Sequence, residues 1–512
     1  MSKKQLPLGT SDFKSLLDEN MYYVDKSPLI AEIIHGARVT LLPRPRRFGK
    51  TLNMSMLSYF FSNAQDYRYL FDELAIAKNA NAMSHCGQYP VIFLSFKDVK
   101  SQSAQGCFGY IKQLMVELFL RYDYLLTSSL LKPAEVVLFE KVLSQQATIE
   151  QFSHGLKFLS LLLHRYHQQP VVIIIDEYDM PINSAYTYGY YDELVGFLRN
   201  LLSGAFKDNS SVFKGVMTGI LRIARESIFS GLNNIDVCSL TSSDFNRGFG
   251  FTEVETEQLL IDYELSDKLP EVRAWYNGYN FGDVTIYNPW SILHFAKKQG
   301  SLAPYWLNTS DNALVRDLIA KAPYELKQEL ELLINDNHKV VRKPLNEHVV
   351  FRDIHVSEDA IWNFLLFSGY LAYKNKALQG KRIYADFFIP NMEVASFYET
   401  AILAWFEQGI DRPQQLSTIL RALLNEELDE FSEAFEQFVK YSFSYFDVSG
   451  MSPESFYHAF VLGMLVELQH THSIKSNRES GLGRYDVCLI PFDKNQPAFV
   501  FGCRSSETTE NQ

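Results

Sequence analysis

Arg38-Val-Thr-Leu-Leu-Pro-Arg-Pro-Arg-Arg-Phe-Gly-Lys-Thr51 is the stretch that decides the fold. Its first part, Arg38–Leu42, is apolar and predicts a buried strand, and Leu52–Leu57, directly after it, predicts a helix. A strand, a Gly-Lys-Thr turn and a helix form a phosphate-binding loop, whose backbone N–H groups and helix N-terminus face the phosphates. The general motif has a glycine six residues before the lysine, where this chain has Arg44. The sequence therefore indicates a variant loop, and a helix cap without a ligand is the alternative.

The residue types of this loop suit a nucleotide with its magnesium ion. We expect Lys50 to reach the β- and γ-phosphate oxygens and the Thr51 hydroxyl to ligate Mg²⁺. Arg46 and Arg47 are placed for phosphate contact, although arginine is also common in solvated loops. The expected nucleotide-binding residues are Arg46, Arg47, Phe48, Gly49, Lys50, Thr51 and Leu52.

A second motif, Val171-Val-Ile-Ile-Ile-Asp-Glu177, is a buried strand that ends in two carboxylates. In nucleotide hydrolases an aspartate at this position holds Mg²⁺ through water, and a following glutamate polarises the attacking water. Asp176 and Glu177 fit these two roles. Alone, the motif would be an ordinary core strand with an acidic turn. Beside a strand–Gly-Lys-Thr–helix unit it favours a nucleotide hydrolase.

A third strand, Val212–Thr218, ends in a polar residue and is followed by arginines. Thr218 could sense the γ-phosphate, and Arg222 could neutralise developing charge. The alternative is a strand-end cap and a surface arginine. Together with Val91–Ser95, the buried strands alternate with helical patterns such as Tyr110–Leu120 and Phe152–Tyr166. This alternation predicts a parallel α/β sheet covered by helices on both faces.

The second half of the chain has a different pattern. From about Phe251 helices dominate, and Ile361–Pro390 predicts a helix, a turn at Ser368-Gly369 and two strands, which is the order of a winged helix. We predict three domains, a P-loop domain over 1–250, a helical and winged-helix-like region over 251–390 and a small α/β domain over 391–512.

Composition limits the class of protein. The 512 residues are 47% hydrophobic and 21% charged, which is typical of a globular chain rather than a disordered one. Lys and Arg number 48 against 60 Asp and Glu, a net charge of −12, which excludes a wholly basic nucleic-acid coat. The N-terminus has no apolar segment typical of a secretion signal, and no apolar run is long enough to cross a bilayer. We expect a cytoplasmic protein without a membrane partner.

Several motifs together resemble the bacterial AAA-ATPase-like proteins. In the first half they are Gly9-Thr-Ser-Asp-Phe13, Tyr22–Ser27, Arg44–Thr51, Ile175-Asp-Glu-Tyr-Asp179 and Phe229–Asn234. Later in the chain they are Tyr276–Tyr279, Tyr287–Trp290, Tyr305–Thr309, Ile389–Glu393 and Ser476–Asp486. The resemblance implies a P-loop ATPase core, a helical and winged-helix middle, and a C-terminal domain similar to PD-(D/E)xK nucleases. Arg44 is usual in the loop of that family.

The nuclease-like site departs from the family pattern. Asp486 stands where the first acid is expected, before a strand predicted at Val487–Ile490. The next strand should end in Glu-x-Lys, but the chain has Gly502-Cys-Arg504 there. Glycine cannot ligate a metal ion, and Arg504 is a poor substitute for a lysine near metal-bound water. We therefore expect a degenerate nuclease domain without cleavage activity.

We predict an ATP- and Mg²⁺-binding protein that hydrolyses ATP and moves its winged-helix and nuclease-like parts with the nucleotide state. The alternative is a non-hydrolysing module that binds a protein or a nucleic acid through its C-terminal half. The adenine preference comes from the resemblance alone. We expect a monomer or a small homo-oligomer.

Overall fold

The structure, a computed structural model, describes residues 3–221, 234–307, 312–335, 339–347, 357–398, 401, 414–445, 461, 465, 468, 470–480, 483–494 and 496–502. The chain divides into two compact units. Unit 1 comprises Met1–Val315 and Asp336–Val394, and unit 2 comprises Arg316–Asn335 and Ala395–Gln512. Unit 1 thus contains the predicted P-loop domain and most of the predicted winged-helix region. The three predicted boundaries stay predictions.

The core of unit 1 is a five-stranded sheet in which all neighbouring strands run parallel. Its strands are β1 (Val39–Pro43), β2 (Val91–Ser95), β3 (Val171–Asp176), β4 (Val212–Gly219) and β5 (Ile235–Val237). They lie in the order β2-β3-β4-β1-β5. The first four almost coincide with the four predicted strands, so the predicted parallel α/β sheet is confirmed. Every residue of β1 and of β3 is buried, because helices cover both faces of the sheet.

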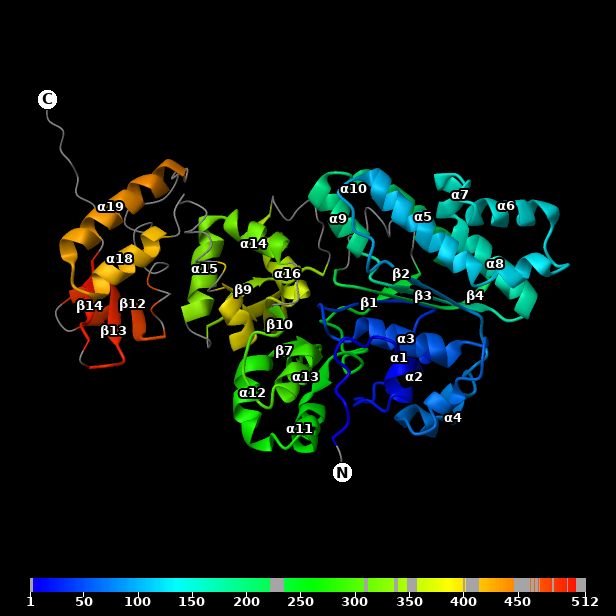
Figure 1. The fold of residues 1–512 in the computed structure, drawn as a ribbon, viewed down its shortest axis with the longest axis horizontal. Helices are drawn as coiled ribbons and strands as arrows, with labels where there is room; N and C mark the ends of the chain where they lie inside the picture. The colour runs from blue at the N-terminus through cyan, green and yellow to red at the C-terminus, as the bar shows by residue number, and fades with distance from the viewer. Residues whose placement is uncertain are drawn as a thin grey trace. The chain divides into compact units, whose positions relative to one another are not determined.

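The covering helices lie in two layers (Figure 1). One face is covered by α1 (Phe13–Asp18), α2 (Pro28–His35) and α3 (Lys50–Phe61), and the other by α5 (Ala104–Leu120), α8 (Gly155–His167) and α10 (Tyr191–Phe206). The remaining helices of this part are α4 (Ala80–Met83), α6 (Pro133–Leu143), α7 (Ile149–Ser153) and α9 (Met180–Tyr188), with 3-10 turns at Arg68–Leu70, Ala75–Lys78 and Asp123–Thr127.

The stretch Phe152–Tyr166 is not one helix. It is broken at His154, between the end of α7 and the start of α8 at Gly155. A Cβ atom on Gly155 would lie 2.4 Å from the Cε atom of Met115 in α5. A single residue separates the two helices, and the apolar periodicity alone does not reveal this break.

Two small antiparallel sheets follow in unit 1. The first, in the order β6-β8-β7, consists of β6 (Phe251–Thr252), β7 (Tyr279–Phe281) and β8 (Val284–Tyr287), and packs with α11 (Glu253–Asp262), α12 (Leu269–Tyr276) and α13 (Pro289–Lys297). A 3-10 turn, Ser266–Lys268, precedes α12. The second, in the order β10-β11-β9, consists of β9 (Val341–Pro344), β10 (Ala372–Gln379) and β11 (Arg382–Phe388). Helix α16 (Glu358–Ser368) precedes β10, and the predicted helix–turn–hairpin order is present; its assignment as a winged helix stays a prediction.

Between these sheets and in unit 2 the chain is mainly helical. Helices α14 (Ala313–Ala320), α15 (Tyr324–Asn335), α18 (Gln414–Leu424) and α19 (Leu428–Tyr445) precede a three-stranded antiparallel sheet of β12 (His472–Ser480), β13 (Gly483–Pro491) and β14 (Phe499–Phe501). Ile419, Leu423 and Leu465 are buried with Val487 and Leu489 of β13 in the core of unit 2. None of the helices among the described residues has the length and apolar content needed to cross a bilayer.

A buried carboxylate joins three distant parts of unit 1. Glu393 accepts hydrogen bonds from the Ser291 hydroxyl in α13 (2.8 Å) and from the backbone N–H of Trp306 (2.7 Å). Its side chain is fully buried, and this burial raises the pKa of the Glu393 carboxyl to about 7.

The raised pKa of Glu393 predicts a pH dependence of stability. The folded state binds the proton more tightly than the unfolded state, so this stabilisation is complete below about pH 4.5 and is lost as the pH rises through 7. In the wild type we expect the free energy of unfolding, measured in urea, to decrease by roughly 3 kcal/mol between pH 4.5 and pH 8 because of this carboxyl. The variant Glu393→Gln should lack that decrease. The same pH dependence in the variant and in the wild type would contradict this account.

Candidate functional site

The loop after β1 is shaped by backbone conformations that favour glycine. Gly49 has φ +85° and stands immediately before α3, whose first N–H groups have no carbonyl partner within the helix. Arg47 also has a positive φ, +69°, which is rare for a residue with a side chain. Such conformations concentrate at ligand sites, where the surrounding structure holds them in place.

Arg44, the residue that replaces the motif glycine, is fully buried and does not line the cavity described below. Its guanidinium donates to the carbonyls of Pro43 (2.8 Å), Cys238 (2.7 Å) and Phe245 (3.1 Å). It also lies 5.1 Å from the ring centroid of Phe249, and burial lowers the pKa of Arg44 to about 10. Arg44 therefore connects the base of the loop to the chain after β5, and its role is structural.

This structural role predicts that truncating the Arg44 side chain strongly lowers the stability of the fold. Arg44→Ala leaves three buried carbonyls without a donor, so we expect a decrease of roughly 3–5 kcal/mol in the free energy of unfolding. Arg44→Lys keeps one donor and should lose less. Urea denaturation measures both, and an Arg44→Ala protein as stable as the wild type would contradict the assignment.

Lys50 is the buried cation of the loop. The residue is 4% exposed, and its ammonium donates to the carbonyls of Arg44 (3.1 Å) and Pro45 (3.0 Å). Burial lowers the pKa of Lys50, while the nearby carboxylates of Glu177, Asp179 and Asp176 act in the opposite direction. The ammonium thus lies inside the loop, where an incoming anion can replace its two carbonyl partners.

Asp176 connects three strands at the carboxyl edge of the sheet. One of its carboxylate oxygens accepts from the hydroxyls of Thr51 (2.9 Å) and Ser95 (3.3 Å), and the other accepts from Thr218 (2.7 Å). This convergence follows from the strand order, because β4 lies between β1 and β3 and brings Thr218 beside the acid. Asp176 and Thr218 are fully buried.

Glu177 and Asp179 follow β3 but have different environments. Glu177 is half-buried, lines the cavity and has φ +51°. Asp179 is buried, and one of its oxygens accepts from the backbone N–H groups of Ile220 (2.7 Å) and Leu221 (3.0 Å). Burial raises the pKa of Asp179. A Cβ atom on Gly219 would lie 2.6 Å from its other oxygen, so β4 must end in glycine here.

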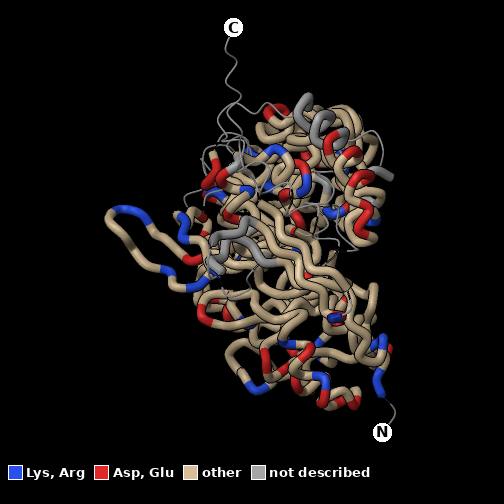
Figure 2. The backbone as a smooth tube through the Cα atoms, turned by 90° about the vertical axis from the view of Figure 1, so that its left-hand side faces the viewer, with Lys and Arg blue, Asp and Glu red and all other residues tan. Residues whose placement is uncertain are grey.

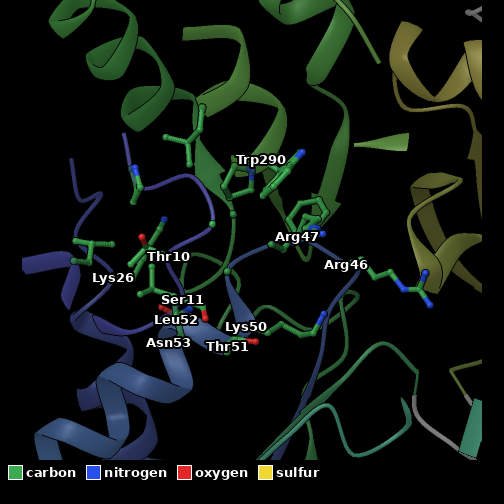
Figure 3. A pocket seen from close by; sticks show the side chains of 18 of the residues that line it. Thr10, Ser11, Lys26, Arg46, Arg47, Lys50, Thr51, Leu52, Asn53 and Trp290 are labelled. Atoms are coloured by element: carbon green, nitrogen blue, oxygen red, sulfur yellow. The ribbon is translucent and has the colours of Figure 1, made fainter. Parts of the chain in front are cut away.

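A cavity of about 520 Å³ opens above the loop (Figure 3). The predicted binding residues Arg46, Arg47, Phe48, Gly49, Lys50, Thr51 and Leu52 all line it, as does Glu177. Asp176 and Thr218 lie behind this wall rather than in it. The ring of Phe48 is fully buried and packs against Tyr279 and Phe281, so Phe48 anchors the loop to the β6-β8-β7 sheet.

The opposite wall of the cavity was missed by the site prediction. Its residues come from the N-terminal segment, from β6 and from the first turns of α13, namely Pro7, Gly9, Thr10, Ser11, Tyr22, Tyr23, Val24, Lys26, Phe251, Pro289, Trp290 and Leu293. Most of them lie in the motifs that carry the family resemblance, whereas Pro7, Phe251 and Leu293 do not. Lys26 is held by Glu255 at 2.7 Å and donates to the carbonyl of Arg247, so its charge is already paired.

The two loop arginines point in different directions (Figure 3). Arg47 lies over the ring of Trp290, with its guanidinium carbon 4.3 Å from the ring centroid. The indole N–H of Trp290 in turn donates to the carbonyl of Tyr305 at 3.2 Å. Arg46 points away from Thr10 and Lys26, and it also lines a second, smaller cavity that contains Asp179 and Asn183.

The remaining predicted residues are Arg222, Asp486, Gly502 and Arg504. Arg222 and Arg504 lie outside the described residues. Asp486 was expected before a strand, but β13 begins at Gly483 and Asp486 lies within it. Strand β13 pairs with β14 from Val487↔Phe501, so continuing the register by one residue places Gly502 across from Asp486.

Comparison with known proteins supports the assignment of the first half. The family model described as predicted AAA-ATPase matches residues 7–229. An uncharacterized protein in the vnfD 5′ region of Azotobacter chroococcum mcd 1 is 29% identical over 330 residues. That match covers 63% of this chain and 57% of the relative, so the chain spans little more than half of the relative's length. The N-terminal region, with its loop, its acidic strand end and one wall of the cavity, is thus similar to the predicted AAA-ATPases.

Proposed function

We propose that this protein binds Mg-ATP in the cavity above the loop and hydrolyses it. The observation that carries the proposal is the Asp176 carboxylate, which is bonded at once to Thr51 of the loop and to Thr218 of β4, beside the buried Lys50. A core strand that merely ends in an acidic turn would not be expected to bring its carboxylate into contact with a Gly-Lys-Thr turn that follows another strand.

The chain's own groups suit each part of the nucleotide. The N–H groups at the start of α3 and the ammonium of Lys50 can receive the β- and γ-phosphates. The Thr51 hydroxyl and the Asp176 carboxylate are oxygen donors of the kind that Mg²⁺ prefers, and the ion supplies charge neutralisation when bound. Glu177, on the cavity wall, is the group that would take the proton from the attacking water.

The wall opposite the loop would receive the nucleobase. Tyr22, Val24, Phe251 and Leu293 supply apolar contact there, and the cavity volume of about 520 Å³ is in the range of small-molecule sites. Arg47 on Trp290 closes the side of the cavity near α13. Preference for adenine over guanine rests on the family resemblance alone.

We further propose that nucleotide binding moves the winged-helix-like region. Two contacts in unit 1 support this. Phe48 packs on Tyr279 and Phe281. Pro45 lies close to Gly369, the residue after α16, since a Cβ atom added to this glycine would be 3.0 Å from the Cβ atom of Pro45. Displacement of the loop by phosphate would thus press on the turn between α16 and β10. The proposed nuclease-like domain would be inactive, because glycine stands across from Asp486.

Calorimetric titration with ATP and GTP, with and without Mg²⁺, and steady-state phosphate release test the proposal. We expect Mg-dependent ATP binding and slow turnover. Binding without turnover would favour the alternative of a non-hydrolysing interaction module stabilised by nucleotide. Absence of binding would contradict the proposal and favour an interaction module whose ATPase and nuclease domains are vestigial.

A further inference from the structure

A cationic β-hairpin projects from unit 1 (Figure 2). It consists of the outer parts of β10 and β11 and the turn Gly380-Lys381, in which Gly380 has φ +61°. Figure 2 shows the two strands extending beyond the neighbouring backbone, with basic residues along them and at the tip. All residues from Lys374 to Ile383 are exposed.

The charge of this hairpin is of one sign. Lys374, Lys376, Lys381 and Arg382 lie within nine residues, and the segment 374–385 has no aspartate or glutamate. Lys374 lies over the ring of Phe388, and Lys376 is 4.0 Å from Glu347. Among the described residues no acidic side chain pairs with Lys381 or Arg382. On a chain with a net charge of −12, such a concentration of cations favours a local polyanion contact.

The base of the hairpin is rigidly braced. Arg342 of β9 donates to Asp386 of β11 (2.8 Å) and to the carbonyl of Asn375 (2.7 Å), and the Asn375 amide donates to Asp386 (2.7 Å). Asn375 has φ +53° and lies at a register shift between β10 and β11. The projecting part is therefore held in one geometry before any partner arrives, which lowers the entropic cost of binding.

We propose that this hairpin binds double-stranded DNA by laying its ribbon in a groove, with Lys381 and Arg382 on the phosphates. The major groove of B-form DNA is wide enough for a two-stranded β-ribbon, whereas that of double-stranded RNA is deep and narrow. The exposed apolar pair at the tip, Leu378 opposite Ile383, is 71% and 38% exposed and would contact the groove floor. This proposal does not depend on ATP binding.

One strand of the hairpin, β10, is an edge strand of its sheet, and lysines on an edge strand, here Lys374 and Lys376, can simply prevent pairing with another chain. The two roles have different consequences. Lysines that only protect the edge can be replaced by glutamine without changing DNA binding, and their loss would appear as self-association. Lysines that contact phosphate contribute to the salt dependence of binding.

Fluorescence anisotropy of the full chain with a labelled 20-base-pair DNA duplex, without nucleotide, at 50 to 200 mM KCl tests the proposal. In the variant Lys381→Gln/Arg382→Gln we expect on the order of tenfold weaker binding at 100 mM salt and a salt slope reduced by about 2. The matched control is Lys297→Gln/Lys298→Gln, two neighbouring exposed cations at the end of α13, which should bind as the wild type does.

Three outcomes would overturn the proposal. They are no duplex binding by the wild type at 50 mM salt, equal losses in both double variants, and equal or tighter binding of an RNA duplex of the same sequence. Thermal melting and light scattering of each variant accompany the titrations. Self-association of the hairpin variant with DNA binding intact would show that Lys381 and Arg382 only prevent association with another chain, and would overturn the proposal as well.

Discussion

Lys50→Ala is expected to weaken Mg-ATP binding by at least about 100-fold, because it removes the buried cation that would contact the β- and γ-phosphates in the proposed site. The ammonium of this residue, which is 4% exposed, lies inside the loop on two backbone carbonyls and is not part of the apolar core. Its removal should therefore affect the ligand more than the fold. Calorimetric titration of wild type and variant measures the change.

The matched control for this experiment is Lys207→Ala. Lys207 is exposed at the end of α10, before β4 begins, and so lies at the amino edge of the sheet, opposite the loop. The control should bind as the wild type does. Unchanged Mg-ATP affinity in Lys50→Ala would falsify the proposed site, provided that both proteins melt at the same temperature without nucleotide.

Glu177→Gln is expected to abolish turnover while binding is retained. Glu177 directly follows β3 and lines the cavity, so its carboxylate can accept a proton from water, and general-base catalysis contributes about 10²–10⁴-fold to rate. Loss of its negative charge beside Lys50 and Arg47 does not remove any phosphate contact, so the affinity for ATP should stay equal or increase. Phosphate release and calorimetry together separate the two effects.

The same substitution at an exposed position, Glu193→Gln in the first turn of α10, controls for the change of charge. It should leave turnover unchanged. If Glu177→Gln lowers affinity and rate in parallel, the side chain supports the shape of the loop and another group activates the water. If it changes neither, Glu177 has no part in the reaction.

The strands of the parallel sheet and the loop residues could be predicted because their signals are local. A strand covered on both faces is a short run of β-branched residues, and β3 has only Val and Ile before Asp176. The break at His154 could not be predicted, because the helical spacing of the apolar residues continues across it, from Phe152 to Leu156 and Leu159. The cavity wall opposite the loop was equally hidden, since Thr10 and Trp290 are far from Lys50 in sequence.

Arg44 shows the limit of motif reasoning most clearly. The sequence indicates only that the motif glycine is replaced, while its carbonyl partners at Cys238 and Phe245 are 194 and 201 residues away. Asp179 was visible as part of a motif, but its hydrogen bonds to Ile220 and Leu221 assign it to the end of β4. Contacts of this kind depend on how separate elements pack, and no spacing along the chain encodes them.

By itself the sequence determined the class of the sheet, the position of the phosphate loop and the identity of the carboxylates after β3, because burial, periodicity and turn chemistry act over a few residues. Only the tertiary structure decided that β4 lies between β1 and β3, so that Thr51, Asp176 and Thr218 meet. It also decided which cations remain available and which are buried or paired, as Arg44 and Lys26 are. The physical reason is that strand order and charge pairing depend on packing between residues that are far apart in the sequence. Which strand or charged side chain becomes a neighbour depends on the fold as a whole.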